Sequence, residues 1–376
     1  MQKLKRFWIV IIPLVVMSII AIIFSILKGY VEIAEWYTNN VSRYYYIAIN
    51  FLTKYIPFSL TEIFFIFLFV SGVVVIVKII IDLKNKRWGD SLKRLGIVAN
   101  MVFSTILVYA LTCEMAYNRK PIDLPYYEQE VESTYFKDVY NYYADDLNYC
   151  TSQLIFDEDG NVHNNYSFKE LSELVHQSAA KCINSDYYFS TTTYAKPLIS
   201  SLIYRELGLT GVTFGPLAES NVNYMATNLE LPFTIAHEVA HTRGVMREDD
   251  ANQFAFYVCL NSDNSYLRFS AYCLYFYQLG LMANTSYIPK EEVDSLHRLD
   301  DNYYYARIYA AKYWKQHNLL QKFGDWINSF YIESSGVPSG TESYSGGTET
   351  HTDPVTLKLV PSKYQKLFFA HYFSHV

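Results

Sequence analysis

Cysteine, proline and glycine are scarce in this chain of 376 residues, which contains 5, 11 and 15 of them, and charged residues make up only 18%. So few cysteines exclude a disulfide-stapled miniprotein, and the absence of a CxxC pair argues against a zinc ribbon or a thioredoxin site. The low glycine and proline contents exclude a collagen-like repeat. Apolar residues are abundant instead. They make up 51% of the chain, which includes 36 tyrosines, and this content excludes a disordered protein.

Charge is divided unevenly along the chain. Residues 1–116 contain 12 basic and 6 acidic side chains, for a net charge of +6, whereas residues 117–376 contain 19 and 31, for a net charge of −12. A basic apolar front and an acidic tyrosine-rich remainder predict a membrane anchor over 1–116 joined to one soluble domain over 117–376.

Three segments near the N-terminus have the length and apolarity of membrane-spanning helices, which need about 20 such residues. They cover residues 7–27, 63–83 and 95–115. A cleaved signal peptide is the rival interpretation of the first segment, but its apolar run is too long and no clean cleavage site follows. Residues 44–60 are aromatic and apolar but include Lys54 and Pro57, so we expect them at the membrane interface.

Basic residues set the predicted orientation, because short cytoplasmic loops are enriched in Lys and Arg. Basic residues precede the first span, and the loop 84–94 has five basic residues and one acidic residue. The loop 29–62 has only Arg43 and Lys54 against three acids. We therefore expect a multi-pass protein of the cell membrane, with the lipid bilayer as a partner, the N-terminus in the cytoplasm and the C-terminal domain outside it.

Helical periodicity dominates beyond the spans, so the expected fold class is mainly α with a small β element. The expected helices cover residues 168–182, 196–207, 231–243, 249–260, 266–282, 290–299 and 303–323. Residues 211–228 predict extended chain or a hairpin, residues 334–353 a polar loop, and His371 and His375 a fraying tail. The four cysteines after the spans could form disulfides or remain buried thiols.

One motif carries chemistry, namely the HExxH sequence from His237 to His241. On a helix, positions i and i+4 lie on one face, so the two imidazoles can bind one zinc ion. Glu238 projects beside that face and can act as the general base that takes a proton from the attacking water. Pro232 suits the first turn of the helix that would carry the motif.

A third ligand is required, and Glu248, Asp249 and Asp250 are the candidates. On a continuous helix Glu248 would lie about 10 Å along the axis from His241, too far to share a metal. Gly244 can end the helix in the left-handed conformation, so that the chain folds back and a second helix begins near Glu248. We favour Glu248. The alternative interpretation is an acidic first turn that the helix dipole stabilises.

Further polar residues are candidates for supporting roles. Asn252 lies one turn after Glu248 and could orient a ligand, and Asp250 and Arg247 adjoin the same turn. Glu219 and Asn223 precede the motif helix, where an edge strand could hold an extended peptide. For an oxyanion donor the neighbouring candidates are Arg243, Arg247, Tyr224 and Tyr257.

Several runs of residues resemble a known family. They are IPFSLTEI (56–63), NRKPIDL (118–124), KPLIS (196–200), AESNVN (218–223) and PFTIAHEVAHTRGVMREDDAN (232–252). The chain is similar to the bacterial multi-pass membrane family catalogued as domain of unknown function 3810, whose members resemble zinc metallopeptidases. The resemblance implies a zincin-like extracytoplasmic domain with zinc as its cofactor. Members typically carry acids at the positions of Glu248 and Asp250, with Glu usual at the second. This pattern favours Glu248 as ligand and Asp250 as support.

Two functional hypotheses follow. The first is a membrane-anchored zinc metalloendopeptidase that acts on a peptide or protein at the cell envelope. The second is a non-catalytic sensor or envelope protein whose metal-stabilised domain binds a ligand or partner. Glu238 favours the enzyme, because a purely structural zinc site needs no general base. A transporter is disfavoured by the small number of spans and their lack of a midplane charge. No nucleic-acid partner is expected.

Overall fold

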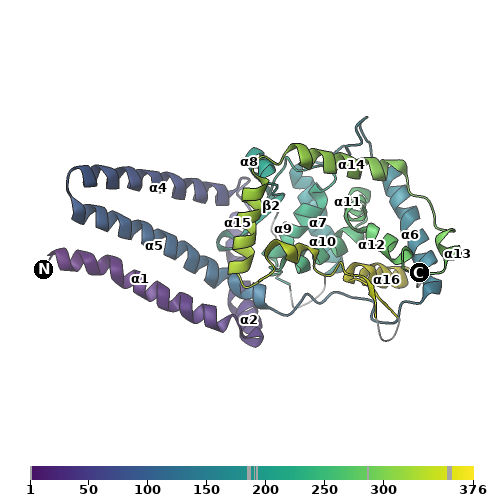
Figure 1. The fold of residues 1–376 in the computed structure, drawn as a ribbon, viewed down its shortest axis with the longest axis horizontal. Helices are drawn as coiled ribbons and strands as arrows, with labels where there is room; N and C mark the ends of the chain where they lie inside the picture. The colour runs from purple at the N-terminus through teal and green to yellow at the C-terminus, as the bar shows by residue number, and fades with distance from the viewer. Residues whose placement is uncertain (1, 184–187, 190, 192–193, 286–287, 354–357) are drawn as a thin grey trace.

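The structure is a computed structural model that describes residues 2–183, 188–189, 191, 194–285, 288–353 and 358–376. It is mainly helical with a small sheet, as the sequence predicts. Three long helices protrude from one end of a body that contains the remaining elements (Figure 1). They are α1 (Gln2–Leu27), α4 (Leu60–Lys84) and α5 (Trp88–Thr112).

Two of these helices meet the requirements of a membrane span on their own. Within the described residues, α4 and α5 are each long and apolar enough to cross a membrane. The first segment qualifies only together with the residues that follow it, as the bent pair Ile11–Leu27 and Val31–Thr53, which turns by 118°. The chain thus has two or three helices that could cross a membrane. The three-span layout and its orientation remain predictions.

Short helices connect the protruding helices to the body. The segments α2 (Val31–Tyr37), η1 (Thr38–Ser42) and α3 (Arg43–Thr53) lie at the end of α1, where the chain bends (Figure 1). Asn50 of α3 is buried and donates to the carbonyl oxygen of Ala218 at 3.4 Å, whereas Phe51 and Leu52 are more than half exposed. The interfacial location expected for residues 44–60 stays a prediction.

Arg119, from the NRKPIDL run, ties the bend to the body. After α5, the short helix η2 (Glu114–Asn118) turns the chain into the body. The Arg119 guanidinium is buried and donates to Glu35 of α2 at 3.1 Å and to the carbonyl oxygen of Gly244 at 3.3 Å. This one side chain therefore connects the bend after α1 with the turn that follows the HExxH helix.

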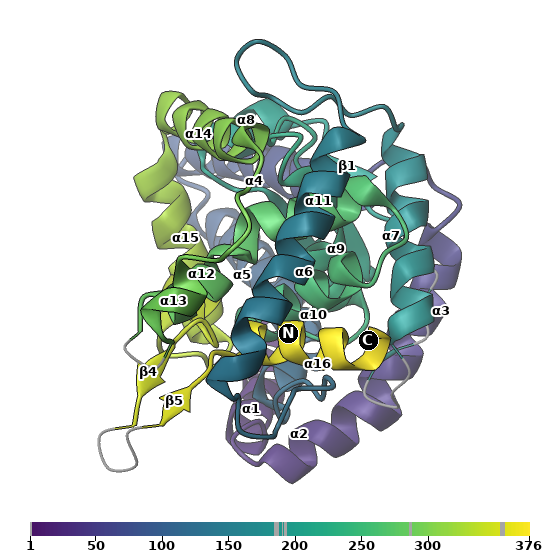
Figure 2. The same cartoon turned by 90° about the vertical axis from the view of Figure 1, so that its right-hand side faces the viewer.

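The HExxH helix is the innermost element of the body. Every residue of α9 (Leu231–Thr242) is buried. The helices α7 (Phe168–Cys182), α10 (Glu248–Leu260) and α11 (Ser265–Tyr275) pack around it (Figure 2). The predicted ranges of the motif helix and of the helices 168–182 and 249–260 agree with α9, α7 and α10 within a residue or so. Buried apolar residues at helical spacing made these three predictable.

Much of the tyrosine serves as core packing. Tyr143 of α6 (Ser133–Ser152) meets Phe368 of α16 (Lys363–His375) edge to face at 4.7 Å, and Phe256 lies 4.9 Å from the same ring. Such ring pairs add about 0.5–1.5 kcal/mol beyond their burial. The expectation of a fraying tail is wrong, because α16 is docked by these rings and His371 Nδ1 lies 2.8 Å from the Tyr143 hydroxyl.

The predicted hairpin forms part of a three-stranded sheet. Strands β2 (Gly211–Phe214) and β3 (Glu219–Val222) pair antiparallel across the short turn η3 (Gly215–Leu217), and β1 (Lys196–Pro197) pairs parallel with β3. The order is β1-β3-β2, so among the described strands β2 lies at an edge and β3 is central. A second small sheet pairs β4 (His351–Thr352) with β5 (Leu359–Val360).

Four predicted helices differ from the structure. The segment 196–207 begins as β1, and only α8 (Ser201–Glu206) is helical, because Pro197 lies in the strand pair and Glu62 accepts the amides of Ile199 and Ser200. The remaining segments are broken. Residues 266–282 divide into α11 and α12 (Tyr277–Ala283), 290–299 shortens to α13 (Lys290–Val293), and 303–323 divides into α14 (Asp301–Gln316) and α15 (Gln321–Ser334). All five cysteines are free thiols.

Candidate metal centre

A glycine turn ends the HExxH helix, as predicted. Gly244 has φ of +86°, and its amide donates to the carbonyl oxygen of His241 at 3.1 Å while the Val245 amide donates to that of Ala240 at 3.2 Å. These two bonds make a Schellman motif, the usual ending of a helix by a left-handed glycine. A side chain at position 244 would also overlap the ring of Phe189. Both the backbone conformation and the available space therefore require glycine.

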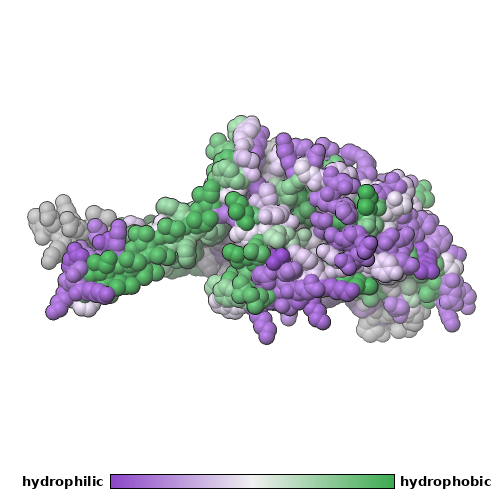
Figure 3. Space-filling view, turned by 90° about the horizontal axis from the view of Figure 1, so that it is seen from above, coloured by the Kyte–Doolittle hydropathy of each residue, from purple (hydrophilic) through white to green (hydrophobic). Residues whose placement is uncertain are grey.

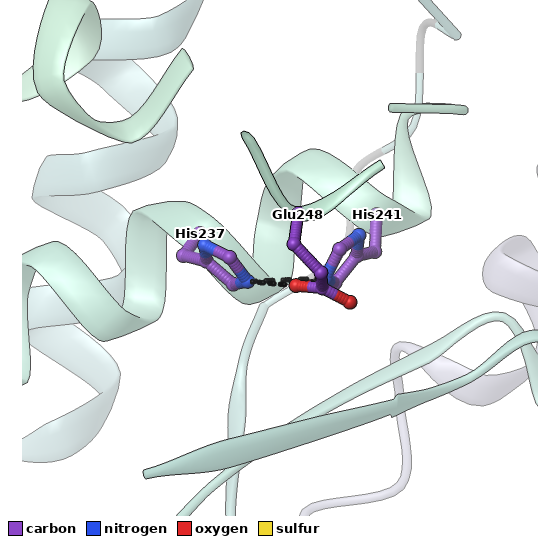
Figure 4. A group of neighbouring side chains, drawn as sticks. All are labelled: His237, His241 and Glu248. Atoms are coloured by element: carbon purple, nitrogen blue, oxygen red, sulfur yellow. Dashed lines mark hydrogen bonds and ion pairs between the residues drawn. The ribbon is translucent and has the colours of Figure 1, made fainter. Parts of the chain in front are cut away.

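The turn brings Glu248 back to the two histidines. Because α10 begins at Glu248, its carboxylate lies across the face of α9 that carries the imidazoles (Figure 4). Glu248 Oε2 is 3.1 Å from His237 Nε2 and 3.5 Å from His241 Nε2, and the two Nε2 atoms are 3.1 Å apart. Within the described residues, these three side chains are the one group whose ligand atoms converge as a metal site requires.

Hydrogen bonds on the far side of each ring fix the direction of its lone pair. His241 Nδ1 is 2.8 Å from the carbonyl oxygen of Val245, which can only accept, so Nδ1 carries the proton. The Asn252 amide nitrogen donates to the carbonyl oxygen of Tyr344 at 3.1 Å, so its oxygen faces His237 Nδ1 at 2.9 Å. In the neutral rings, both Nε2 atoms then present lone pairs to the carboxylate of Glu248.

The charge balance of the group calls for a cation. Burial disfavours the charged form of each of these side chains. At His241 the largest opposing effect is the negative charge of Glu248, and the pKa of that imidazole rises to about 9 despite the burial. Burial likewise opposes ionisation of Glu248, yet His241 and His237 hold its pKa below the usual range. Three acceptors around one point, one of them ionised, therefore attract a proton or a metal ion.

The three donors fit a zinc ion. Bonds of about 2.0–2.1 Å in a tetrahedral site place neighbouring donors about 3.3–3.4 Å apart, close to the separations of 3.1, 3.1 and 3.5 Å found here. Two imidazoles and one carboxylate are also one of the donor sets of catalytic zinc, which keeps its fourth position open. The chemistry and the geometry of the donors thus agree.

Glu238 lies between this group and the edge strand. Glu238 is 4% exposed, and its Oε2 accepts a hydrogen bond from the Thr213 hydroxyl at 2.7 Å. A side chain at Gly211 would overlap the Glu238 carboxylate, so the glycine allows β2 to pass directly beside it. Burial raises the pKa of Glu238, against the opposing effect of the two histidines. A carboxylate with a raised pKa is the stronger base.

Tyr344 was missed by the sequence reasoning, which assigned residues 334–353 to a polar loop. It lies in the short helix η4 (Gly340–Ser345) and stacks on the ring of His237, with 6.1 Å between centroids and 23° between planes. Its hydroxyl accepts a hydrogen bond from Asn328 of α15 at 3.3 Å. Burial and the charge of Glu248 raise its pKa. One tyrosine among 36 gave no signal in the sequence.

The other predicted site residues divide into two sets. Asn252 contacts His237, as described above. Asp250 is buried nearby, where burial and the charge of Asp249 raise its pKa to about 6, but it does not join the ligand group. Arg247 donates to Asp249 at 3.0 Å and lies 3.7 Å from Asp250. This acidic turn thus supports the start of α10 rather than supplying a further ligand.

Glu219 and Asn223 are structural in the fold. Glu219 lies in the central strand, fully buried, where its carboxylate pairs with Lys196 and accepts hydrogen bonds from the amide and hydroxyl of Thr61 at 2.8 Å. Asn223 is also fully buried and donates to the carbonyl oxygen of Leu209 at 2.9 Å. The expectation that this segment forms the edge is wrong, because β2 occupies that position.

Comparison with known proteins gives one assignment. No curated protein and no solved structure matches the chain. A family model described as a protein of unknown function, DUF3810, matches residues 37–349, which run from the end of α2 to just beyond Tyr344. The matched region includes the whole candidate metal centre. The chain therefore belongs to the DUF3810 family.

Proposed function

We propose that this protein is a membrane-anchored, zinc-dependent metallopeptidase-like hydrolase. The observation that carries the proposal is the convergence of His237 Nε2, His241 Nε2 and Glu248 Oε2 at separations of 3.1–3.5 Å, with the carboxylate of Glu238 beside them. His237, His241 and Glu248 would hold the zinc ion. When bound, zinc supplies Lewis acidity that polarises a carbonyl group and activates water near neutral pH.

The residues of the chain supply the remaining chemistry. Glu238 takes a proton from the attacking water and returns it to the leaving amine, which its burial and raised pKa favour. Thr213 holds the Glu238 carboxylate in place, since its hydroxyl donates to Oε2 at 2.7 Å. A purely structural metal site would need neither residue. Their arrangement favours hydrolysis over the alternative of a metal-stabilised sensor.

The tyrosine of η4 is the proposed oxyanion donor. Tyr344 stacks on His237, and its hydroxyl lies within the influence of the Glu248 charge. A phenol held at this place can donate a hydrogen bond to the carbonyl oxygen as negative charge develops on it. Asn328, whose amide donates to the same hydroxyl, orients the ring.

An extended peptide is the proposed substrate. Strand β2 has a partner on one side only in the sheet of described strands, and it passes beside Glu238. A peptide chain that adds to this edge would place its backbone carbonyl groups along the candidate centre. We propose further that α4 and α5 anchor the protein in the cell membrane, with the body outside the cytoplasm, as the basic loop 84–94 indicates.

The test uses the purified full-length chain in detergent. We expect about one zinc ion per chain by elemental analysis and cleavage of a peptide library. Glu238→Gln should keep the zinc and lose about 10²-fold or more of the cleavage rate. Glu173→Gln makes the same change on the exposed surface of α7 and should alter neither. Wild-type protein that binds no zinc would refute the proposal, and zinc without cleavage would favour the sensor.

A further inference from the structure

Helix α15 lies across the ends of all three protruding helices. Near its start, the Leu320 amide donates to the carbonyl oxygen of Glu206 at 2.9 Å, at the end of α8. The other end of α8 is fixed to the first turn of α4, because Glu62 accepts the amides of Ile199 and Ser200 at 2.7 and 2.8 Å. This end of α15 is therefore connected to α4.

The other end of α15 reaches α5 and α1. The Ser335 hydroxyl, just beyond the helix, lies 2.5 Å from the hydroxyl of Tyr109 in α5. Lys28, just after α1, donates to the carbonyl oxygen of Ser334 at 3.1 Å. Figure 1 shows the consequence, since α15 runs across the direction of the protruding helices at the place where they enter the body.

The outer face of α15 is an apolar stripe. Phe323, Trp326, Ile327 and Phe330 are 53%, 62%, 40% and 65% exposed, and their spacing of i, i+3, i+4 and i+7 places them on one face. Asp325 lies between Phe323 and Trp326 in the sequence, but helical geometry places it on the other side of the helix, so it does not interrupt the stripe. Within the body, a stripe of this kind would be buried, and on a soluble surface it would promote aggregation. Its exposure calls for a partner.

Neighbouring residues extend the stripe towards the spans. On α8 and just before it, Ile199, Leu202 and Ile203 are 78%, 55% and 56% exposed, and Ile199 is hydrogen-bonded to the first turn of α4. On α4 the exposed apolar side chains begin at Ile63, one residue after Glu62. Ile63 is 49% exposed. Figure 3 shows hydrophobic residues that continue from the protruding helices onto the adjoining end of the body.

We infer that α15 is an interfacial helix, whose stripe of Phe323, Trp326, Ile327 and Phe330 rests in the headgroup region of the bilayer that α4 and α5 cross. The inference rests on the proposed membrane anchoring. Continuity with the spans identifies lipid as the occupant, because a helix across their ends lies at the membrane surface. Tryptophan and phenylalanine are also the side chains typical of such helices.

The opposite face of the same helix reaches the candidate metal centre. Asn328 points inward and donates to the hydroxyl of Tyr344, which stacks on His237. A helix with its side chains is about 10 Å thick, so the centre would lie roughly that far from the lipid surface. The substrate class that this geometry favours is a polypeptide segment presented at the membrane surface, such as the external part of another membrane protein.

The test measures the depth of α15 in lipid. The full-length chain is reconstituted into nanodiscs of phosphatidylethanolamine and phosphatidylglycerol, and Trp326→Cys or Phe330→Cys is labelled with an environment-sensitive fluorophore. Tyr304→Cys, an exposed aromatic position on α14, is the matched control. The unsubstituted chain gives the background from its five cysteines, four of which are buried.

At positions 326 and 330 we expect blue-shifted emission. Lipid-borne spin labels should quench most of this fluorescence, and aqueous iodide should quench little of it. At position 304 iodide should quench and spin-labelled lipid should not. The inference is overturned if iodide quenches positions 326 and 330 as strongly as position 304. Zinc content measured on the same samples separates the two proposals, because lipid contact without zinc would refute only the metal site, and zinc without lipid contact only the interfacial helix.

Discussion

Asn252 offers the sharpest test of how the histidine pair is held. Its oxygen accepts the Nδ1 proton of His237 at 2.9 Å, and its nitrogen donates to the carbonyl oxygen of Tyr344 at 3.1 Å. Asn252→Ala removes both bonds, so that His237 can rotate or exchange its tautomer. His241 would remain fixed by the backbone of Val245, which no side-chain substitution removes.

The expected loss follows from this geometry. Removal of a hydrogen-bond partner behind a metal-binding histidine weakens metal affinity about 10–100-fold, or about 1.4–2.8 kcal/mol. We expect Asn252→Ala to fall in this range in a zinc titration against a chromophoric chelator at pH 7.5. Asn252→Asp should restore the affinity, because its carboxylate also accepts the His237 proton. A merely structural role would not be rescued in this way.

The control lies on the same helix. Asn261 caps the end of α10, and its side-chain nitrogen donates to the Tyr257 carbonyl oxygen at 2.8 Å. Asn261→Ala should reduce thermal stability modestly and leave zinc affinity unchanged. The reasoning would be refuted if Asn252→Ala bound zinc within twofold of the wild-type protein, or if both alanine variants lost affinity to the same degree.

Three further predictions concern other parts of the body. Gly211→Ala should lower hydrolysis about tenfold or more with zinc retained, because the new methyl group overlaps the Glu238 carboxylate, and peptide cleavage beside elemental analysis checks this. Lys196→Met should cost about 3–5 kcal/mol in chemical denaturation, because it leaves the buried Glu219 carboxylate without its cation, and Glu219→Gln in the same chain should recover part of the loss. Burial, together with the charge of His375, lowers the pKa of His371 to about 4, so the unfolded chain takes up this proton first and stability should fall as the pH drops from about 6.5 to 4. His371→Gln should flatten that part of a profile of melting temperature against pH.

Each of these predictions has a control. Gly280→Ala adds a methyl group that meets no atom within 4 Å and should leave cleavage unchanged. Lys181→Met removes an exposed ion pair and should cost far less than Lys196→Met. His163→Gln, at an exposed position, should keep the wild-type pH profile. Wild-type cleavage by Gly211→Ala, equal stability of the two lysine variants, or an unchanged profile for His371→Gln would contradict the respective argument.

The sequence was most informative where local rules coincide with tertiary structure. Gly244 has to be glycine for its backbone and for its neighbour Phe189, and the resulting turn determines that Glu248, not a later residue, meets the histidines. Asn252 followed from the same helical spacing. Helices α4 and α5 were predictable because an apolar run long enough to cross a membrane is recognised without any tertiary contact.

The misses share a physical cause, which is contact between segments distant in sequence. Residues 196–200 resemble a helix until Glu62, more than 130 positions away, accepts their amides. Tyr344 reaches His237 only because the chain after α15 brings η4 back against α10. No local sequence pattern specifies such long-range contacts. The edge position of β2, the docking of the C-terminal helix and the place of Tyr344 could therefore be identified only in the folded chain.

Hydrogen bonds at the junction between the protruding helices and the body limit how the body can move relative to those helices. Tyr45 donates to the carbonyl oxygen of Pro216 at 2.5 Å, and Arg119 joins the bend after α1 to Gly244, which follows the HExxH helix. If α4 and α5 cross a membrane, these bonds would keep the body from swinging freely about them. The candidate centre would then stay at a constant height above the bilayer. It would select peptide bonds by their distance from the membrane as much as by their sequence.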